Sequence, residues 1–299
     1  MNREARLFGA VEAGGTKFVC AVGDEDGILL AEARFPTADP NSTLAKVREF
    51  LGESSRALGA LNAIGVASFG PVVLDRASPS YGCIANTPKA GWSGTDMIGA
   101  LEQQFSCPVG FDTDVNAAAL AERRWGAGHG IGNLVYLTVG TGIGGGVLIN
   151  GAPLHGLSHP EIGHILPRRH PLDPAFSGVC PFHGDCLEGL ASGPAIVART
   201  GTELQHLAAE HIQWDIEADY LGQLCAQLVL TLSPQRIVMG GGVMSQQRLL
   251  PAIRQRMQHW LGGYVDRSEI LGSVDTYVAA PALGVRSGIL GALALGLTV

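Results

Sequence analysis

Two glycine-rich loops of the same design, far apart in a chain of 299 residues, constrain the fold more than any other feature. The first is EAGGTK at residues 12–17, and the second is GTGIGGG at residues 140–146. An apolar run precedes each loop and another follows it, which predicts strand, glycine turn and strand in both places. Glycine lets backbone N–H groups approach a bound anion closely, and the neighbouring threonine adds a hydroxyl donor. The repeat predicts a duplicated phosphate-holding unit and a cleft between two halves.

Neither loop fits a familiar nucleotide-binding motif. Residues 140–145 match G-x-G-x-x-G, but that dinucleotide fingerprint requires a helix directly after it, whereas a β-branched run and an Asn-Gly turn follow here. In the first loop, Gly-Thr-Lys stands where the Walker motif requires Gly-Lys-Thr, and no helical pattern follows. Two glycine-rich hairpins that bind nothing remain the alternative.

The composition limits the partners of this chain. Hydrophobic residues make up 46% of the sequence and charged residues 16%, which suffices for a large core divided between two lobes. A net charge of -7 argues against a nucleic-acid surface, because binding to phosphates needs clustered Lys and Arg. The lysines are Lys17, Lys46 and Lys89, so local cations, backbone N–H groups and a metal ion would hold a phosphorylated ligand. Residues 1–6 are polar and no apolar run is long enough to cross a bilayer, so we expect a soluble, cytoplasmic protein without a signal peptide.

The segment CPFHGDC at residues 180–186 is a candidate zinc site. Cys180, His183 and Cys186 are separated by two-residue gaps, which allow all three side chains to face one ion. With one more imidazole they would form a closed tetrahedral set, the kind that stabilises structure and leaves no open position for catalysis. A polar loop with free thiols is the alternative. The fourth ligand would be His164, in competition with His155, His159 and His170.

Strands and helices alternate in both halves of the chain, which predicts an α/β architecture. The last apolar, alanine-rich run, at residues 288–297, suits a helix that packs back on the body. The other expected strands are at 7–11, 18–22, 28–35, 63–69, 107–111, 134–139 and 236–239, and the expected helices lie at 44–58, from 115 onwards, around 220–232 and up to 260.

Asp114 is the candidate catalytic residue. It lies where the strand expected at 107–111 gives way to a helix, so its carboxylate would point into the cleft near the glycine loops. A carboxylate there would take the proton from a sugar hydroxyl as that oxygen attacks a γ-phosphoryl group. The alternative is helix capping, because Asp112, Thr113 and Asp114 are all good N-cap residues.

The order of these motifs resembles that of the ROK-family sugar kinases, which have a duplicated actin-like (ribonuclease H-like) ATPase fold. The resemblance extends over essentially the whole chain. Residues 68–71, 87–92 and 157–160 look most like the bacterial fructokinase branch. The segments that carry the family resemblance are EAGGTK at 12–17, DTDVNAAA at 112–119, GTGIG at 140–144, EIGH at 161–164, the loop at 180–186 and GGGV at 240–243.

This resemblance implies a role for each matching position, with Asp114 as the catalytic base. The sugar would contact Thr113, Glu161, His164 and Glu188, and zinc would bind His164, Cys180, His183 and Cys186. The ATP phosphates would contact Gly14, Gly15, Thr16, Lys17, Gly140, Thr141 and Gly142. The adenosine would contact Pro194, Gly240, Gly241, Gly242, Val243 and Met244. His164 would thus serve the metal and orient the sugar pocket beside it.

Four positions depart from the wider family. Glu12 replaces the usual aspartate, which leaves the contact with Mg²⁺ open or makes it water-mediated. Thr113 stands where many members have an asparagine, so one sugar-binding amide is missing. Lys89 replaces another asparagine and is either a phosphate contact or a surface lysine, and His183 replaces a cysteine of the zinc loop. Glu12, Lys89 and His183 are what we expect of the fructokinase branch.

The sequence therefore predicts an ATP-dependent fructokinase, with Mg²⁺ accompanying ATP, a structural Zn²⁺ and, by family resemblance, a homodimer. One alternative is another ROK hexose kinase, for mannose, glucose or N-acetylmannosamine. The other is a non-catalytic, sugar-sensing regulator. Family regulators carry a helix-turn-helix region ahead of the kinase-like body, whereas the first phosphate-loop strand here starts at Leu7. The expected lobes are residues 1–115, with a terminal helix at 288–299 packing back on them, and residues 116–287, which carry the zinc loop 164–186.

Overall fold

The structure, a computed structural model, describes residues 6–299 and divides the chain into two compact units. The first unit comprises Met1–His129, Ala152–His159 and Val285–Val299, and the second comprises Gly130–Gly151 and Pro160–Gly284. The expectation that the chain has no signal peptide rests partly on the polar segment 1–6. Residues 1–5 of that segment lie outside the described residues.

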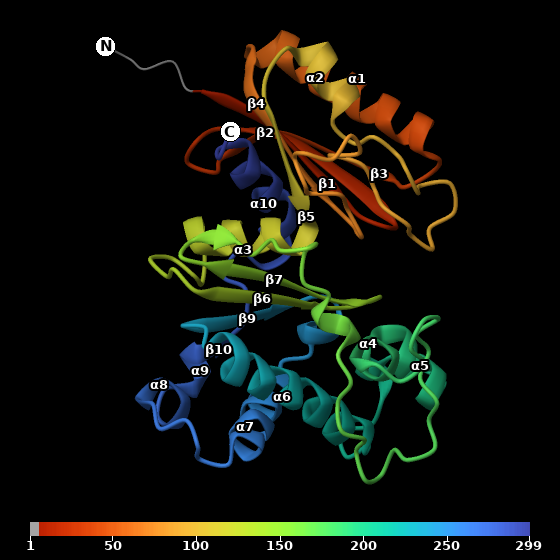
Figure 1. Cartoon of the computed structure of the whole chain (residues 1–299), viewed down its shortest axis with the longest axis vertical. Helices are drawn as coiled ribbons and strands as arrows, with labels where there is room; N and C mark the ends of the chain where they lie inside the picture. The colour runs from red at the N-terminus through yellow and green to blue at the C-terminus, as the bar shows by residue number, and fades with distance from the viewer. Residues whose placement is uncertain (1–5) are drawn as a thin grey trace. The chain divides into compact units, whose positions relative to one another are not determined.

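The first unit contains a mixed sheet with the strand order β3-β2-β1-β4-β5 (Figure 1). β1 pairs antiparallel with β2 and parallel with β4, β2 pairs antiparallel with β3, and β5 lies parallel to β4. In β3 exposed and half-buried residues alternate, as expected for an edge strand with one covered face. The strands are β1 (Leu7–Ala13), β2 (Lys17–Gly23), β3 (Leu29–Pro36), β4 (Leu61–Ser68) and β5 (Val109–Thr113).

The α-helices in the described part of this unit are α1 (Pro40–Leu58), α2 (Gly99–Phe105), α3 (Asp114–Trp125) and α10 (Ser287–Gly296). Asp39 caps α1 by accepting a hydrogen bond from the backbone N–H of Ser42, and proline at the first position suits the start of a helix. The blue C-terminal helix α10 lies beside the red and orange strands of the same unit (Figure 1). A Cβ atom at Gly65 of β4 would lie 1.8 Å from the carbonyl oxygen of Ala292, so α10 contacts the backbone of the sheet directly.

The second unit contains another mixed sheet, in which β10, β9, β6 and β7 are neighbours in that order. β7 pairs antiparallel with β6, whereas β9 lies parallel to β6 and β10 parallel to β9. The strands are β6 (Leu134–Val139), β7 (Ile143–Ile149), β9 (Arg236–Gly240) and β10 (Val278–Ala279), while β8 (Ala152–Pro153) lies in the short stretch that belongs to the first unit.

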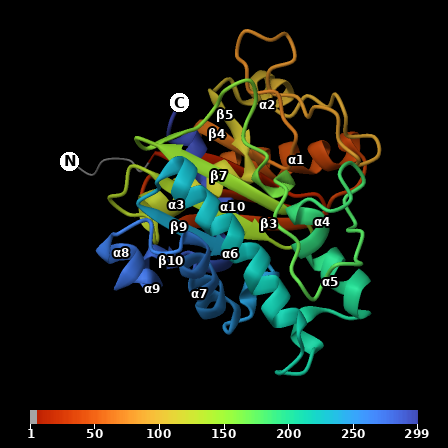
Figure 2. The same cartoon turned by 60° about the horizontal axis from the view of Figure 1, so that its bottom comes forward.

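The longest helix of the second unit, α6 (Gln213–Leu232), is buried along most of its length and packs against α7 (Leu249–Leu261), as Figure 2 shows. A Cβ atom at Gly222 would lie 3.0 Å from the backbone nitrogen of Met257, so this glycine allows the two helices to approach closely. The remaining elements are η1 (Ile162–His164), α4 (Leu187–Ala191), α5 (Gly193–Thr200), η2 (Leu204–His206), η3 (Val243–Ser245), α8 (Ser268–Leu271), α9 (Val274–Tyr277) and η4 (Gly284–Arg286) at the boundary of the units.

The α/β architecture is confirmed by two mixed sheets with helices. The boundaries of the two units differ from those of the expected lobes, residues 1–115 and 116–287, because α3 belongs to the first unit. The alanines of α3 are buried, and Gly291 of α10 approaches the backbone of Ala117 so closely that a Cβ atom would clash. Within residues 6–299, no helix is both long and apolar enough to span a membrane.

Candidate active site

The first glycine loop is a tight turn between β1 and β2. The N–H of Gly14 donates to the carbonyl of Lys17 at 3.0 Å, and the carbonyl of Gly14 accepts from the hydroxyl of Thr37 at 2.7 Å. A Cβ atom at position 14 would lie 2.7 Å from the carbonyl oxygen of Lys17, so the turn requires glycine there. Gly15, Thr16 and Lys17 are exposed. The loop therefore presents backbone, a hydroxyl and an ammonium group at the surface of this unit.

Lys89 lies against this loop. Its ammonium group donates to the carbonyl oxygen of Gly15 at 2.5 Å. The segment that carries Lys89 is anchored by the buried Trp92, whose ring centroid lies 5.5 Å from the rings of both Phe18 and Phe69. Lys89 is thus held beside the glycine loop by a hydrogen bond from its ammonium group to the backbone.

Glu12 lies just before the loop, against the start of α10. A Cβ atom at Gly288 would lie 2.5 Å from the carboxyl carbon of Glu12. Burial raises the pKa of Glu12, and the nearby charges of Lys17 and Arg34 partly oppose that shift. A carboxylate in this position carries an electrostatic penalty that a bound cation would relieve.

At the start of α3, three neighbouring side chains accept hydrogen bonds from backbone N–H groups. Thr113 is the N-cap, since its hydroxyl accepts from the N–H of Asn116 at 3.1 Å. Asp112 is buried, and its Oδ1 accepts from the N–H of Thr113 at 2.7 Å and from the side-chain amide of Asn116 at 2.8 Å. Asp114 is the first residue of the helix and is half-buried, with Oδ1 accepting from the N–H of Val115 at 2.9 Å. Thr113 is therefore the N-cap residue of α3, and Asp114 adds one hydrogen bond to the first turn.

The second glycine loop joins β6 and β7 and is tied to two helices. The carbonyl of Gly140 accepts from the N–H of Gly193, at the start of α5, at 2.7 Å. Glu188 of α4 accepts from the N–H of Ile143 at 2.9 Å, and a Cβ atom at Gly142 would lie 2.6 Å from the same carboxylate oxygen. Glu188, which the family resemblance predicts to contact the sugar, thus supports this loop in the structure.

The four expected metal ligands, His164, Cys180, His183 and Cys186, come together, with ligand atoms within 4.8 Å of one another. The Nδ1 atom of His164 lies 3.4 Å from the sulfur of Cys186 and 3.8 Å from that of Cys180, and Nδ1 of His183 lies 3.7 Å from the sulfur of Cys180. Two thiols and two imidazoles at these separations fit a tetrahedral zinc ion.

The other candidate histidines have different partners. His155 Nε2 lies 2.8 Å from Asp112, His159 accepts from the N–H of Val72 at 3.2 Å, and His170 lies 3.5 Å from Asp215. Of the four histidines considered from the sequence, His164 alone is a member of the cluster.

Short backbone contacts link the Cys/His cluster to the second glycine loop. Cys180 and Gly184 exchange backbone hydrogen bonds of 3.1 and 2.9 Å, which closes the turn that carries His183. A Cβ atom at Gly163, beside His164, would lie 1.9 Å from the carbonyl oxygen of Ile143, so η1 packs against the start of β7. Exposed Glu161 directly precedes this turn.

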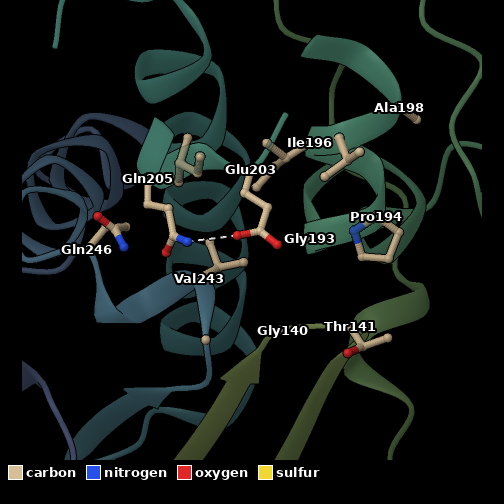
Figure 3. Close-up of a pocket in the computed structure, with 13 residues that line it drawn as sticks. Gly140, Thr141, Gly193, Pro194, Ile196, Ala198, Glu203, Gln205, Val243 and Gln246 are labelled. Carbon is tan, nitrogen blue, oxygen red and sulfur yellow. Dashed lines mark hydrogen bonds between the residues drawn. The ribbon is translucent and has the colours of Figure 1, made fainter. Parts of the chain in front are cut away.

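A cavity of about 640 Å³ opens beside the second glycine loop within the second unit (Figure 3). Of the expected nucleotide contacts, Gly140, Thr141, Pro194, Gly242 and Val243 line it. Sequence reasoning missed the rest of its lining, which comes from α5, η2 and the segment after η3: Gly193, Ile196, Val197, Ala198, Glu203, Leu204, Gln205 and Gln246.

The other expected nucleotide residues of this unit lie outside the lining. Gly240 is buried in β9, where a Cβ atom would lie 2.6 Å from the hydroxyl of Tyr136. Gly241 has a φ of +97° and approaches the backbone of Val139 closely, so both glycines shape the backbone around the cavity. Gly142 and Met244 also lie outside the lining, and Gly14, Gly15, Thr16 and Lys17 belong to the first unit.

The two glycine turns, the Cys/His cluster and the cavity beside the second turn are consistent with the sugar-kinase class that the sequence resembles, and comparison with known families agrees. The ROK family model matches residues 8–299, and the chain belongs to the ROK family. The fructokinase of Zymomonas mobilis is 44% identical over 99% of this chain and 98% of its own. The fructokinase of Lactococcus lactis is 41% identical over 92% of this chain and 91% of its own.

Solved structures have the same fold. The ROK hexokinase from Thermus thermophilus has a TM-score of 0.77 and 28% identity, with 98% of each chain covered. The ROK glucokinase from Streptomyces griseus, in complex with glucose and AMPPNP, has a TM-score of 0.74 and 24% identity, with 98% of this chain and 100% of that chain covered.

Proposed function

We propose that this protein is an ATP-dependent fructokinase that converts D-fructose to D-fructose 6-phosphate on a duplicated actin-like fold. The observation that carries the proposal is near-full-length similarity, at 41% and 44% identity, to relatives named fructokinase. The AMPPNP complex of the Streptomyces griseus glucokinase supports ATP as the phosphoryl donor.

Asp114 acts as the general base. It takes the proton of the 6-hydroxyl group as that oxygen attacks the γ-phosphorus, and ADP leaves with the electron pair of the broken P–O bond. The support is that Thr113 caps α3, so the cap alternative does not account for Asp114. Thr113, Glu161, His164 and Glu188 contact the sugar.

The nucleotide occupies the cavity beside the second glycine loop. Its adenosine lies among Pro194, Gly242 and Val243, and nearby Gly240, Gly241 and Met244 set the backbone there. The phosphates bind Gly140, Thr141 and Gly142 and the exposed first loop, Gly14, Gly15, Thr16 and Lys17, where N–H and ammonium donors suit an anion. Mg²⁺ bound with ATP would screen the phosphate charge, and the half-buried Glu12 carboxylate fits the preference of this ion for oxygen ligands, directly or through water.

Zinc binds His164, Cys180, His183 and Cys186. The support is the donor set itself, two thiols and two imidazoles within 4.8 Å. Such a set serves a structural ion, which would fix the turn before α4 and the ring of His164.

The test is a coupled ADP-release assay on fructose, mannose, glucose and N-acetylmannosamine at equal, subsaturating concentrations. We expect the highest kcat/KM with fructose, mannose next and the N-acetylated sugar poor. A pocket that recognises hydroxyls leaves its own polar groups unpaired when the wrong sugar binds. If glucose or N-acetylmannosamine led, the fructokinase assignment would fail and the kinase assignment would stand. If the protein released no ADP with any hexose of the panel, a sugar-sensing regulator would be the better description.

A further inference from the structure

Asp112 carries a buried carboxylate two residues before the proposed base, Asp114. Its side chain is only 3% exposed. Its Oδ1 accepts from the N–H of Thr113 at 2.7 Å and from the side-chain amide of Asn116 at 2.8 Å. Because these two donors flank Asp114 in the first turn of α3, the orientation of the Asp112 carboxylate affects the geometry of that turn.

The other oxygen of Asp112 is held by a residue from a distant part of the chain. His155 Nε2 lies 2.8 Å from Oδ2 of Asp112, and the imidazole is 41% exposed while the carboxylate is buried. A buried carboxylate oxygen that loses its donor is left unsolvated, which disfavours the orientation that places it there. His155 therefore helps to fix the Asp112 carboxylate.

The segment that carries His155 is fixed at a second point. His159 is buried, and its Nε2 accepts from the N–H of Val72 at 3.2 Å. A ring nitrogen that accepts a hydrogen bond must be unprotonated, whereas the Nε2–H of His155 can donate in both the neutral and the charged ring. His155 can therefore change its charge while His159 still holds the segment.

We propose that Asp112 and His155 form a positioning pair that keeps Asp114 in the orientation required for phosphoryl transfer. The inference rests on the proposed role of Asp114 as the base. The pair acts through Thr113 and Asn116, not on the reacting atoms. The positive charge of His155 also offsets the negative charge of Asp112. Without His155, that negative charge would disfavour ionisation of a second carboxylate nearby.

The charges around the pair determine its response to pH. The hydrogen bond to Asp112 raises the pKa of His155, while partial burial opposes the shift. Asp112 also affects Tyr81: burial raises the pKa of Tyr81, the charge of Arg76 lowers it, and the charges of Glu102 and Asp112 raise it. We expect His155 to stay cationic above its ordinary pKa of 6.5 and kcat to decline at alkaline pH as that charge is lost.

The experiment compares His155→Ala, His155→Gln and Asp112→Asn, with His129→Ala as the control. His129 is an exposed histidine of the same unit whose ring Nδ1 lies 3.1 Å from the carbonyl oxygen of Arg124, so its replacement should leave kcat unchanged. Kinetics are measured with the best hexose of the panel, so a wrong fructose label does not affect the comparison.

We expect His155→Ala to lower kcat about 10- to 100-fold, the effect of a small misplacement of a catalytic group, with KM values within about threefold of wild type. Glutamine at 155 keeps an N–H donor but carries no charge at any pH. It should therefore give a kcat above that of His155→Ala, equal to that of the wild-type protein at alkaline pH, and show no alkaline decline. Asp112→Asn should lower kcat similarly, and the double variant with His155→Ala should be no worse than Asp112→Asn alone.

Three results would overturn the pair: a wild-type kcat in His155→Ala, additive losses in the double variant, or a defect in the KM for hexose alone. The last would mean that His155 binds sugar. Absence of kinase activity in the wild-type protein with every hexose would instead refute the proposed function, and this inference with it.

Discussion

At the scale of single residues, the first turn of α3 separates helix capping from the proposed chemistry. Thr113 caps the helix through Asn116, so Asp114→Asn should leave the free energy of unfolding almost unchanged. The same change should lower kcat by about two to four orders of magnitude, the usual effect of removing a positioned base, with ATP and hexose binding nearly intact. Steady-state kinetics and urea unfolding of the same preparation measure both effects.

Thr113→Ala is the matched control for capping. It removes the acceptor for the N–H of Asn116 and should cost about 1 kcal/mol of stability, the typical worth of an N-cap side chain. If Asp114→Asn turned over at the wild-type rate, the base would have to be another residue.

Glu12 gives a second prediction at this scale. Its pKa is raised by burial, with Lys17 opposing, so ionisation of Glu12 is harder in the folded protein than in the unfolded chain. Stability due to this group is therefore full below its ordinary pKa of 4.5 and is lost as the pH rises through the folded-state pKa. Glu12→Gln should raise Tm at pH 7 and have little effect on it at pH 4, while activity falls because a proposed Mg²⁺ contact is lost.

Glu217→Gln is the control for that effect. Glu217 is fully buried in α6, and burial raises its pKa well above the ordinary value, but it has no proposed part in the reaction. The Glu217→Gln substitution should also raise Tm at pH 7 and leave kcat unchanged. Equal gains in Tm at pH 4 and pH 7 for Glu12→Gln would contradict an electrostatic cause.

At the scale of elements, the Cys/His cluster joins η1 to the turn before α4. We expect about one zinc ion per chain by metal analysis. Replacing both Cys180 and Cys186 by serine should remove the ion, lower Tm and raise the KM for hexose, because the ring of His164 would lose its fixed orientation. Cys83→Ser, outside the cluster, should keep the ion. Active protein without zinc and insensitive to a chelator would contradict this prediction.

Patterns that depend on neighbouring residues were predictable from the sequence. Both strand–glycine–strand units and the turn at residues 180–186 depend on short-range periodicity, glycine and ligand spacing. The choice of Thr113 as the cap was not, because three adjacent residues are good caps and only the backbone geometry distinguishes them. Glu203 and Gln205 were missed for a similar reason, since polar residues in a short connection resemble any solvated surface until the cavity is seen.

At the scale of the whole molecule, the chain passes between its two units four times, after residues 129, 151, 159 and 284. The first unit is therefore complete only when the last helix, α10, packs against β4 and α3. The sequence analysis expects the terminal helix to pack back on residues 1–115. The expected boundary at residue 115 differs from the observed one because α3, which packs against α10, also belongs to the first unit. The closeness of the contact depends on glycines that let backbones touch.

A substitution at Gly291 of α10 tests whether this helix must pack closely against α3 to complete the first unit. A Cβ atom there would lie 2.4 Å from the backbone carbon of Ala117, and backbone cannot move aside as a flexible side chain can. Gly291→Ala should therefore destabilise the protein by about 1–3 kcal/mol, the usual effect of overpacking. Gly52→Ala, inside α1, meets only the flexible end of Gln104 at 3.4 Å and should stabilise by about 0.5–1 kcal/mol, because alanine favours the helix. Urea unfolding of the two variants should thus give changes of opposite sign, and a stabilised Gly291→Ala would show that α10 does not close the first unit in the way described.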